Sequence, residues 1–157
     1  MVLGLRTSRL ILREWPEDDL EPSIALSMDP EVMRHLARPR GRAEVERWVA
    51  GARAHFRDHG FAFGRSRSPG VADLAGFAGL TTVPYEAHFT PAVGRLARAY
   101  WGNGYASEAA KAALDLAFFD LGLAEVVANA AIANKASIRV MERIGMSRDR
   151  AMISTIR

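Results

Sequence analysis

The sequence contains no cysteine. Disulfides, zinc–thiolate sites, iron–sulfur clusters and a cysteine nucleophile are therefore excluded. It also has no run approaching the roughly 18 apolar residues of a membrane-spanning helix, and its first residues lack the apolar core of a signal peptide. These absences predict a cytoplasmic protein with no membrane partner.

Lysine is scarce as well: apart from Lys111 and Lys135, the basic residues are arginines, and the net charge is only +3. The arginines are scattered, whereas nucleic-acid binding favours a contiguous basic surface interleaved with aromatic residues. We therefore expect no direct nucleic-acid binding, and the small excess charge fits an anionic ligand equally well. A ribosome- or RNA-associated protein is the least favoured alternative, and it predicts binding that weakens steeply with salt.

The length and composition indicate one globular domain over residues 1–157, with 49% hydrophobic and 25% charged residues. A chain of this size buries a sufficient hydrophobic core without a disulfide or a bound metal. The spacing of apolar residues predicts an α/β (α+β) domain with a central mixed β-sheet flanked by helices. Strands are expected at residues 10–15, 61–64, 74–80, 93–99 and 126–130. A helix is expected to start at residues 16–20, and further helices are expected at 29–36, 45–59, 107–121 and 137–144. Residues 84–91 are expected to form a loop.

A glycine-rich stretch, Tyr100-Trp101-Gly102-Asn103-Gly104-Tyr105-Ala106-Ser107-Glu108-Ala109, precedes the most strongly periodic helix. Glycine lets backbone N–H groups approach a ligand closely, and a helix N-terminus behind such a loop favours phosphate. A Walker loop is excluded because Gly104 is followed by Tyr105 and not by lysine. A Rossmann fingerprint is excluded because the acidic residue required about 20 positions further on, at the end of the next strand, is missing. The stretch predicts a phosphate-binding loop, with a purely structural turn as the alternative.

Residues 96–146 resemble the acetyl-CoA-binding core of the GNAT superfamily of N-acetyltransferases. The resemblance is strongest to the RimJ/RimL branch, which includes ribosomal-protein N-terminal acetyltransferases. It is carried by residues 100–109, by Leu121-Gly122-Leu123, and by Asn134-Lys135-Ala136-Ser137-Ile138-Arg139-Val140-Met141-Glu142-Arg143-Ile144-Gly145-Met146. Residues 7–13 resemble the first strand of this branch, and residues 75–80 resemble its third.

The resemblance implies acetyl-CoA as co-substrate and no metal. The loop would wrap the CoA pyrophosphate with backbone amides, and the preceding strand would offer backbone hydrogen bonds to pantetheine. The implied cofactor-binding residues are Leu96, Ala97, Arg98, Trp101, Gly102, Asn103, Gly104, Tyr105, Ala106, Asn134, Ser137 and Met141. For Asn134 a helix N-cap is the competing role, and the two roles can coexist.

For catalysis, the resemblance to the RimJ/RimL branch implies that Ser137 is the general acid. Many other members use a tyrosine four residues later, where this sequence has Met141. Members commonly place a general base in a Glu-hydrophobic-Gly pattern on the fourth strand, and residues 91–96 lack that glutamate. Glu86 and His88 are the nearest substitutes, and we take Glu86 as the candidate base. Glu108 is assigned to the first turn of its helix rather than to a base.

After Gly145-Met146, family members continue through two strands, whereas residues 151–156 here can form at most one. Either the last strand is missing or a partner subunit completes the sheet, so a homodimer is one expectation. The leading interpretation is an acetyl-CoA-dependent N-acetyltransferase in which a primary amine attacks directly within a ternary complex. The acceptor is a protein N-terminus or a small-molecule amine. The alternative is a degenerate acyl-CoA-binding module with weak or no catalysis.

Overall fold

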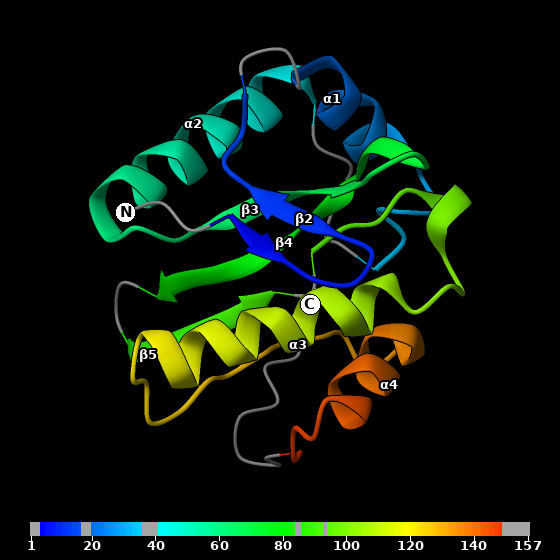
Figure 1. The fold of residues 1–157 in the computed structure, drawn as a ribbon. Helices are drawn as coiled ribbons and strands as arrows, with labels where there is room; N and C mark the ends of the chain where they lie inside the picture. Colours follow the sequence, from blue (N-terminus) through cyan, green and yellow to red (C-terminus); the bar gives the residue numbers. More distant parts are fainter. Residues whose placement is uncertain (1–3, 17–19, 36–40, 84–85, 93, 149–157) are drawn as a thin grey trace.

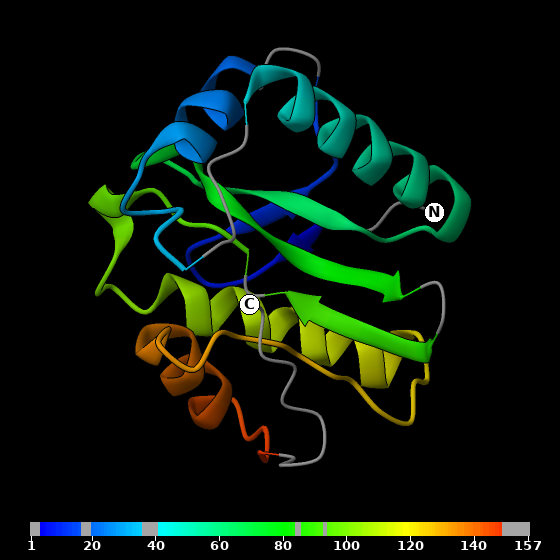
Figure 2. The ribbon, with the colours of Figure 1, turned by 180° about the vertical axis from the view of Figure 1, so that it is seen from behind.

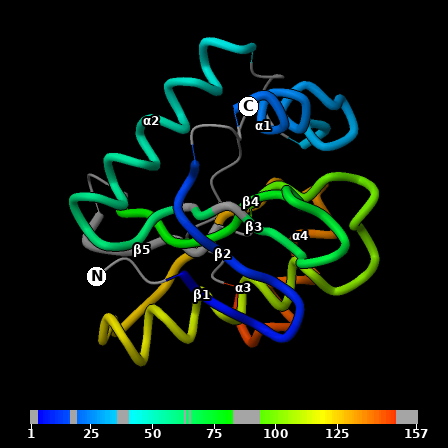
Figure 3. Tube along the Cα trace, turned by 45° about the horizontal axis from the view of Figure 1, so that its top comes forward, coloured from blue at the N-terminus to red at the C-terminus, as the bar shows by residue number. Residues whose placement is uncertain are grey.

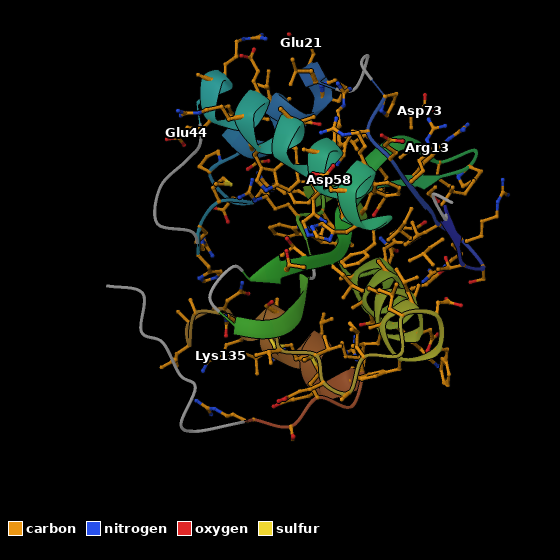
Figure 4. The ribbon with its side chains drawn as sticks, turned by 90° about the vertical axis from the view of Figure 1, so that its left-hand side faces the viewer. Arg13, Glu21, Glu44, Asp58, Asp73 and Lys135 are labelled. Atoms are coloured by element: carbon orange, nitrogen blue, oxygen red, sulfur yellow. The ribbon has the colours of Figure 1, made fainter. Side chains whose placement is uncertain are left out.

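The computed structural model describes residues 4–16, 20–35, 41–83, 86–92 and 94–148. A central sheet is covered by one pair of helices on one face and a second pair on the other (Figure 1, and from behind in Figure 2). The first pair is α1 (Leu20–Met28) and α2 (Arg42–His59); the second is α3 (Tyr105–Asp115) and α4 (Lys135–Arg143). In Figure 4, Glu21 and Asp58 accordingly lie across the sheet from Lys135. The predicted α/β class is confirmed.

Within the described ranges, the sheet has five strands in the order of the chain. They are β1 (Leu5–Arg6), β2 (Ile11–Arg13), β3 (Phe63–Ser68), β4 (Ala72–Val83) and β5 (Glu86–Ala92). All four described pairings are antiparallel, which corrects the expectation of a mixed sheet. The strand expected at 126–130 contains only a bridge residue, Val126, and its neighbours line a cavity beneath α4 instead.

Side chains alternate along β4, because successive residues of a strand point to opposite faces. Phe77 packs with Trp15 from the end of β2 and with a cluster on α1 and α2 that comprises Leu26, Val45, Val49 and Ala52. Ala78 and Leu80 pack on the other face, against α3. The blue β1–β2 hairpin lies beside α3 in Figure 3, and Leu10 and Leu12 are buried against this helix.

Two predicted boundaries change because backbone pairing extends the strands. The β3–β4 hairpin forms around the predicted turn at 68–70, but β3 runs to Ser68 and β4 from Ala72 to Val83. The predicted loop at 84–91 is wrong, since Glu86–Ala92 is strand β5. Its Pro91 is tolerated because β5 is an edge strand among the strands that the structure describes.

The helices show three further differences. The helix expected at 29–36 is a series of turns over residues 30–35. The helix expected at 107–121 begins earlier, at Tyr105, and ends in a π-helical turn, η3 (Leu116–Asp120). The helix expected at 137–144 is α4, which begins at Lys135 and contains no buried residue.

None of the helices in the described ranges combines the length and apolar character needed to cross a bilayer. The strand expected at 151–156 falls outside the described residues.

Candidate functional site

The glycine-rich loop over residues 101–104 is exposed and leads directly into α3. Gly102 and Gly104 have φ values of 76° and 80°, in the left-handed region that favours glycine. Gly104 is the N-cap of α3 and supplies no side-chain cap. The first helical hydrogen bond runs from the Glu108 N–H to the Gly104 carbonyl, at 3.0 Å. The N–H groups of residues 105–107 thus have no intrahelical acceptor, and together with the helix dipole they suit a phosphate.

The chain enters this loop from an extended segment that pairs with β4. The Phe77 N–H donates to the Arg95 carbonyl and the Ala97 N–H to the Ala75 carbonyl, both at 2.9 Å. The N–H and carbonyl of Leu96 therefore point to the opposite edge, where an extended ligand can add as a further strand. The expected strand at 93–99 is shorter than predicted over its described part, residues 94–99: only Leu96 forms a bridge there, and residues 98–100 form a 3₁₀ turn, η2 (Arg98–Tyr100).

A bulge separates this segment from β5. Ala92 pairs with Gly79, and Leu96 pairs with Gly76. The chain therefore advances four residues from Ala92 to Leu96 while β4 advances only three, so this side of the pairing contains one extra residue. A Cβ on Gly94, within the bulge, would lie 1.5 Å from the Phe77 carbonyl oxygen. Only glycine fits this crossing, which redirects the chain from β5 toward the glycine-rich loop.

Trp101 links the loop to the extended segment. Its indole Nε1–H donates to the Leu96 carbonyl at 2.8 Å, although 47% of the residue is exposed. The Asn103 side-chain amide donates to the Trp101 carbonyl at 3.0 Å. The structure thus brings together Leu96, Trp101 and Asn103 from the predicted cofactor-binding set.

Glu108 ties α3 to the turn between β1 and β2. Its Oε1 accepts hydrogen bonds from the Thr7 hydroxyl, from the Ser8 hydroxyl at 3.1 Å and from the Arg9 N–H at 2.9 Å. Burial tends to raise the pKa of Glu108, but these hydrogen bonds and that of the Arg9 side chain outweigh it and hold the pKa below its usual 4.5. An ionised carboxylate so fully engaged is a poor proton acceptor, which agrees with its assignment to the helix rather than to a base.

Sequence reasoning missed the contribution of Arg9 and Glu108 to this loop. Near Arg9, the sequence predicts a strand only at residues 10–15, and no local spacing relates two residues that are 99 positions apart. The available signal was a Thr-Ser-Arg turn near the start of the chain and an acidic residue in the first turn of α3.

The predicted site residues near the C-terminus lie on α4, which Figures 1 and 2 place beside the N-terminal end of α3. Asn134 is the N-cap of α4, because its Oδ1 accepts a hydrogen bond from the Ser137 N–H at 3.1 Å. Met141 lines a cavity of about 520 Å³ between α4 and the segment 124–130. No other predicted cofactor-binding residue lines that cavity.

Glu86 and His88 lie on β5, and their side chains are outside the described part of the structure. The Glu86 backbone opposes Val83, whereas Ala92 opposes Gly79 next to the bulge. At roughly 3.3 Å per residue, Glu86 is about 20 Å along the strand from Ala92. Within the described ranges, no group of three or more His, Asp or Glu side chains is placed to hold a metal ion.

A sequence model of the acetyltransferase (GNAT) domain matches residues 9–147. The uncharacterized protein YkkB of Bacillus subtilis is 31% identical over 90% of this chain and 84% of its own length. The FsC-acetyl coenzyme A-N(2)-transacetylase of Aspergillus fumigatus is 30% identical over 91% of this chain. The matched region spans 64% of that enzyme.

Solved structures agree at the level of the fold. An acetyltransferase from Agrobacterium tumefaciens superposes with a TM-score of 0.88 and 24% identity, covering 100% of this chain and 90% of that one. Spermidine N-acetyltransferase from Vibrio cholerae, solved with CoA and spermine, gives a TM-score of 0.74 and 20% identity over 91% of this chain and 83% of that one.

Proposed function

The chain belongs to the GNAT acetyltransferase family, and from that membership we propose that it is an acetyl-CoA-dependent N-acetyltransferase acting on a primary amine. The observation that carries the proposal is the exposed loop at 101–104, with two left-handed glycines and an α3 N-terminus that has no side-chain cap. That arrangement suits the pyrophosphate of CoA. The curated relative from Aspergillus fumigatus is named for transfer from acetyl coenzyme A to nitrogen.

The donor would be held at two places. Backbone N–H groups of residues 101–106 would bind the pyrophosphate, and the outward edge of Leu96, Ala97 and Arg98 would bind the pantetheine arm as an added strand. The geometry of Leu96, whose N–H and carbonyl face away from β4, supports the second part. The site would be closed from α4 by Asn134, Ser137 and Met141, with the Asn134 side-chain amide donating to the pantetheine arm. No metal takes part in this proposal.

The reaction requires a neutral amine, an acyl donor and a proton for the leaving thiolate. Within a ternary complex the amine nitrogen forms a bond to the acetyl carbon as the carbon–sulfur bond breaks. The Ser137 hydroxyl would supply the proton to the sulfur. Glu86 stays the candidate base, but its backbone lies about 20 Å along β5 from Ala92, so the amine proton would pass first to solvent water rather than directly to Glu86. Holding both reactants in one site supplies a large part of the rate by proximity.

For the acceptor, we propose a protein N-terminus or a small-molecule amine, and we place the chain in the RimJ/RimL-like branch. The branch rests on the residue patterns at 7–13, 100–109 and 134–146. The cytoplasmic location stays a prediction from the sequence.

A degenerate acyl-CoA-binding module is the second candidate, and two observations favour it. No residue of α4 is buried, and residues 127–130 form no strand in the described structure. A poorly supported α4 would hold Asn134 and Ser137 loosely, which affects turnover more than it affects binding at the glycine-rich loop.

The test is isothermal titration with acetyl-CoA, followed by measurement of free-thiol release with a panel of amines. The panel contains spermine, an aminoglycoside and a peptide with a free N-terminus. Micromolar binding with amine-dependent thiol release supports the enzyme. Binding without release supports the module, and no binding overturns both.

A pair of glycine variants tests the loop itself. Gly104→Val places a β-branched side chain at φ 80° in the loop, and Gly70→Val imposes the same backbone strain at φ 75° in the β3–β4 turn. We expect only Gly104→Val to abolish acetyl-CoA binding. Equal binding by the two variants would contradict the role of the loop.

A further inference from the structure

The Arg9 guanidinium joins the turn between β1 and β2 to the glycine-rich loop and the start of α3, which lie more than 90 positions later in the sequence. Its Nη1 donates to the Asn103 carbonyl at 2.8 Å, and its Nε donates to Glu108 Oε2 at 2.7 Å. Its Nη2 lies 2.6 Å from the same carboxylate oxygen. The guanidinium carbon also lies 4.6 Å from the centroid of the Tyr105 ring. Arg9 thus contacts the glycine-rich loop through Asn103, the first residue of α3 through Tyr105, and the first turn of α3 through Glu108.

The contact to Asn103 fixes the direction of the next N–H group. In a trans peptide the carbonyl and the following N–H point in opposite directions, and the structure contains no cis peptide among its described residues. Holding the Asn103 carbonyl toward Arg9 therefore turns the Gly104 N–H away from Arg9. Without that contact, rotation of the peptide between Asn103 and Gly104 is less restricted, because Gly104 has no Cβ.

The charge of Arg9 is balanced by Glu108, so the pair adds little net field at the loop. The Glu108 carboxylate is itself fixed, since its side chain is only 16% exposed and binds the turn at residues 7–9. The arrangement therefore orders the loop during folding, and a ligand does not bear that ordering cost when it binds.

We propose that Arg9 is a positioning residue for the donor site: it pre-orients the backbone amides of the glycine-rich loop at 101–104 toward the pyrophosphate of CoA. This inference rests on the proposed function. Arg9 acts through Asn103 and Glu108, and it does not itself contact the donor.

The test separates ordering of the loop from a general loss of stability. Steady-state kinetics of Arg9→Ala are measured with acetyl-CoA and with S-acetylpantetheine, a donor that lacks the pyrophosphate. We expect the KM for acetyl-CoA to rise roughly tenfold or more, as for loss of a charge-assisted hydrogen bond, with kcat little changed. The KM for S-acetylpantetheine should stay within about twofold.

Arg42→Ala is the matched control. Arg42 forms a similar fork with Glu21, at 2.7 and 2.8 Å, but on α1 and α2 rather than at the loop. It should leave both KM values for the donors unchanged. Arg9→Lys replaces Arg9→Ala if the latter does not fold, because a single ammonium cannot hold Asn103 and Glu108 in the same fork.

Two results would overturn the proposal: an unchanged KM for acetyl-CoA, or an equal rise for both donors. If turnover is absent, the dissociation constants of CoA and pantetheine replace the KM values. A wild-type protein that binds no acetyl-CoA would instead refute the proposed function, so the two failures are distinguishable.

Discussion

Asn134 caps α4 through its side-chain oxygen, which accepts the Ser137 N–H at 3.1 Å. The cap and the proposed contact to pantetheine use different atoms, because the amide nitrogen of Asn134 is a donor and the cap needs only the acceptor. One residue therefore holds the proposed general acid in the first turn of its helix and offers a hydrogen-bond donor to the ligand.

Substitutions at Asn134 separate these two roles. Asn134→Asp keeps an oxygen cap but removes the donor, whereas Asn134→Ala removes both. We expect Asn134→Ala to lose about 1 kcal/mol of unfolding free energy, and Asn134→Asp to retain nearly all of it. Both variants should bind acetyl-CoA more weakly by titration calorimetry. Wild-type affinity in Asn134→Asp would rule out the contact to pantetheine.

The contact network of Glu108 predicts a loss of stability in acid. Its pKa is lowered on folding, so the unfolded chain binds the proton more readily, and stability falls as pH falls. The contribution is complete above about 4.5 and is lost as pH drops through the lowered value. Against Glu108→Gln, the wild type should be more stable at pH 7 by about 1–3 kcal/mol, and the difference should shrink toward pH 3 in urea titrations.

Glu21→Gln is the control for that experiment, because Glu21 is also paired with an arginine but is exposed. Solvent and salt screen such a pair, so its pH-dependent effect should be small. A constant difference between wild type and Glu108→Gln from pH 7 to pH 3 would contradict the prediction.

The sequence was sufficient to predict those helices and strands in which apolar residues recur at a regular spacing. The spacing of apolar residues predicted a helix at 45–59, which is α2, and the structure ends it at Gly60 in the left-handed conformation. β5 was missed because prolines at positions 84 and 91 bracket most of it and favour a loop, although residues 86–90 alternate between polar and apolar side chains. Its pairing with β4 is a tertiary interaction, and Pro91 is tolerated only because the strand is at the edge of the sheet.

The candidate site also has one part that the local sequence predicts and another part that depends on tertiary contacts. Glycine spacing located the loop at 101–104, because the conformation of a glycine is a local property. The attachment of Arg9 to that loop depends on the β1–β2 hairpin lying over α3, which no local pattern encodes. The bulge at Gly94 depends in the same way on the crossing with Phe77.

Two glycine-to-alanine substitutions should change stability in opposite directions. At Gly94 the added Cβ would fall 1.5 Å from the Phe77 carbonyl, so the strands must separate, at a cost of about 3 kcal/mol or more. At Gly51, within α2, nothing lies within 4 Å of the added Cβ, and alanine should stabilise the helix by about 0.5–1 kcal/mol. Urea unfolding checks both, and a stable Gly94→Ala variant would refute the tight crossing.

Trp101 already donates to a backbone acceptor that the proposed ligand would also use. The Leu96 carbonyl lies on the edge assigned to pantetheine, and the Trp101 indole N–H already donates to it at 2.8 Å. Trp101→Phe removes that donor while keeping an aromatic ring and the loop backbone. If pantetheine uses this carbonyl, the variant should bind acetyl-CoA about two- to tenfold more tightly, since a typical hydrogen bond contributes roughly 0.5–1.5 kcal/mol. Weaker binding in calorimetry would mean that the indole contact supports the donor site and that the ligand does not take its place at Leu96.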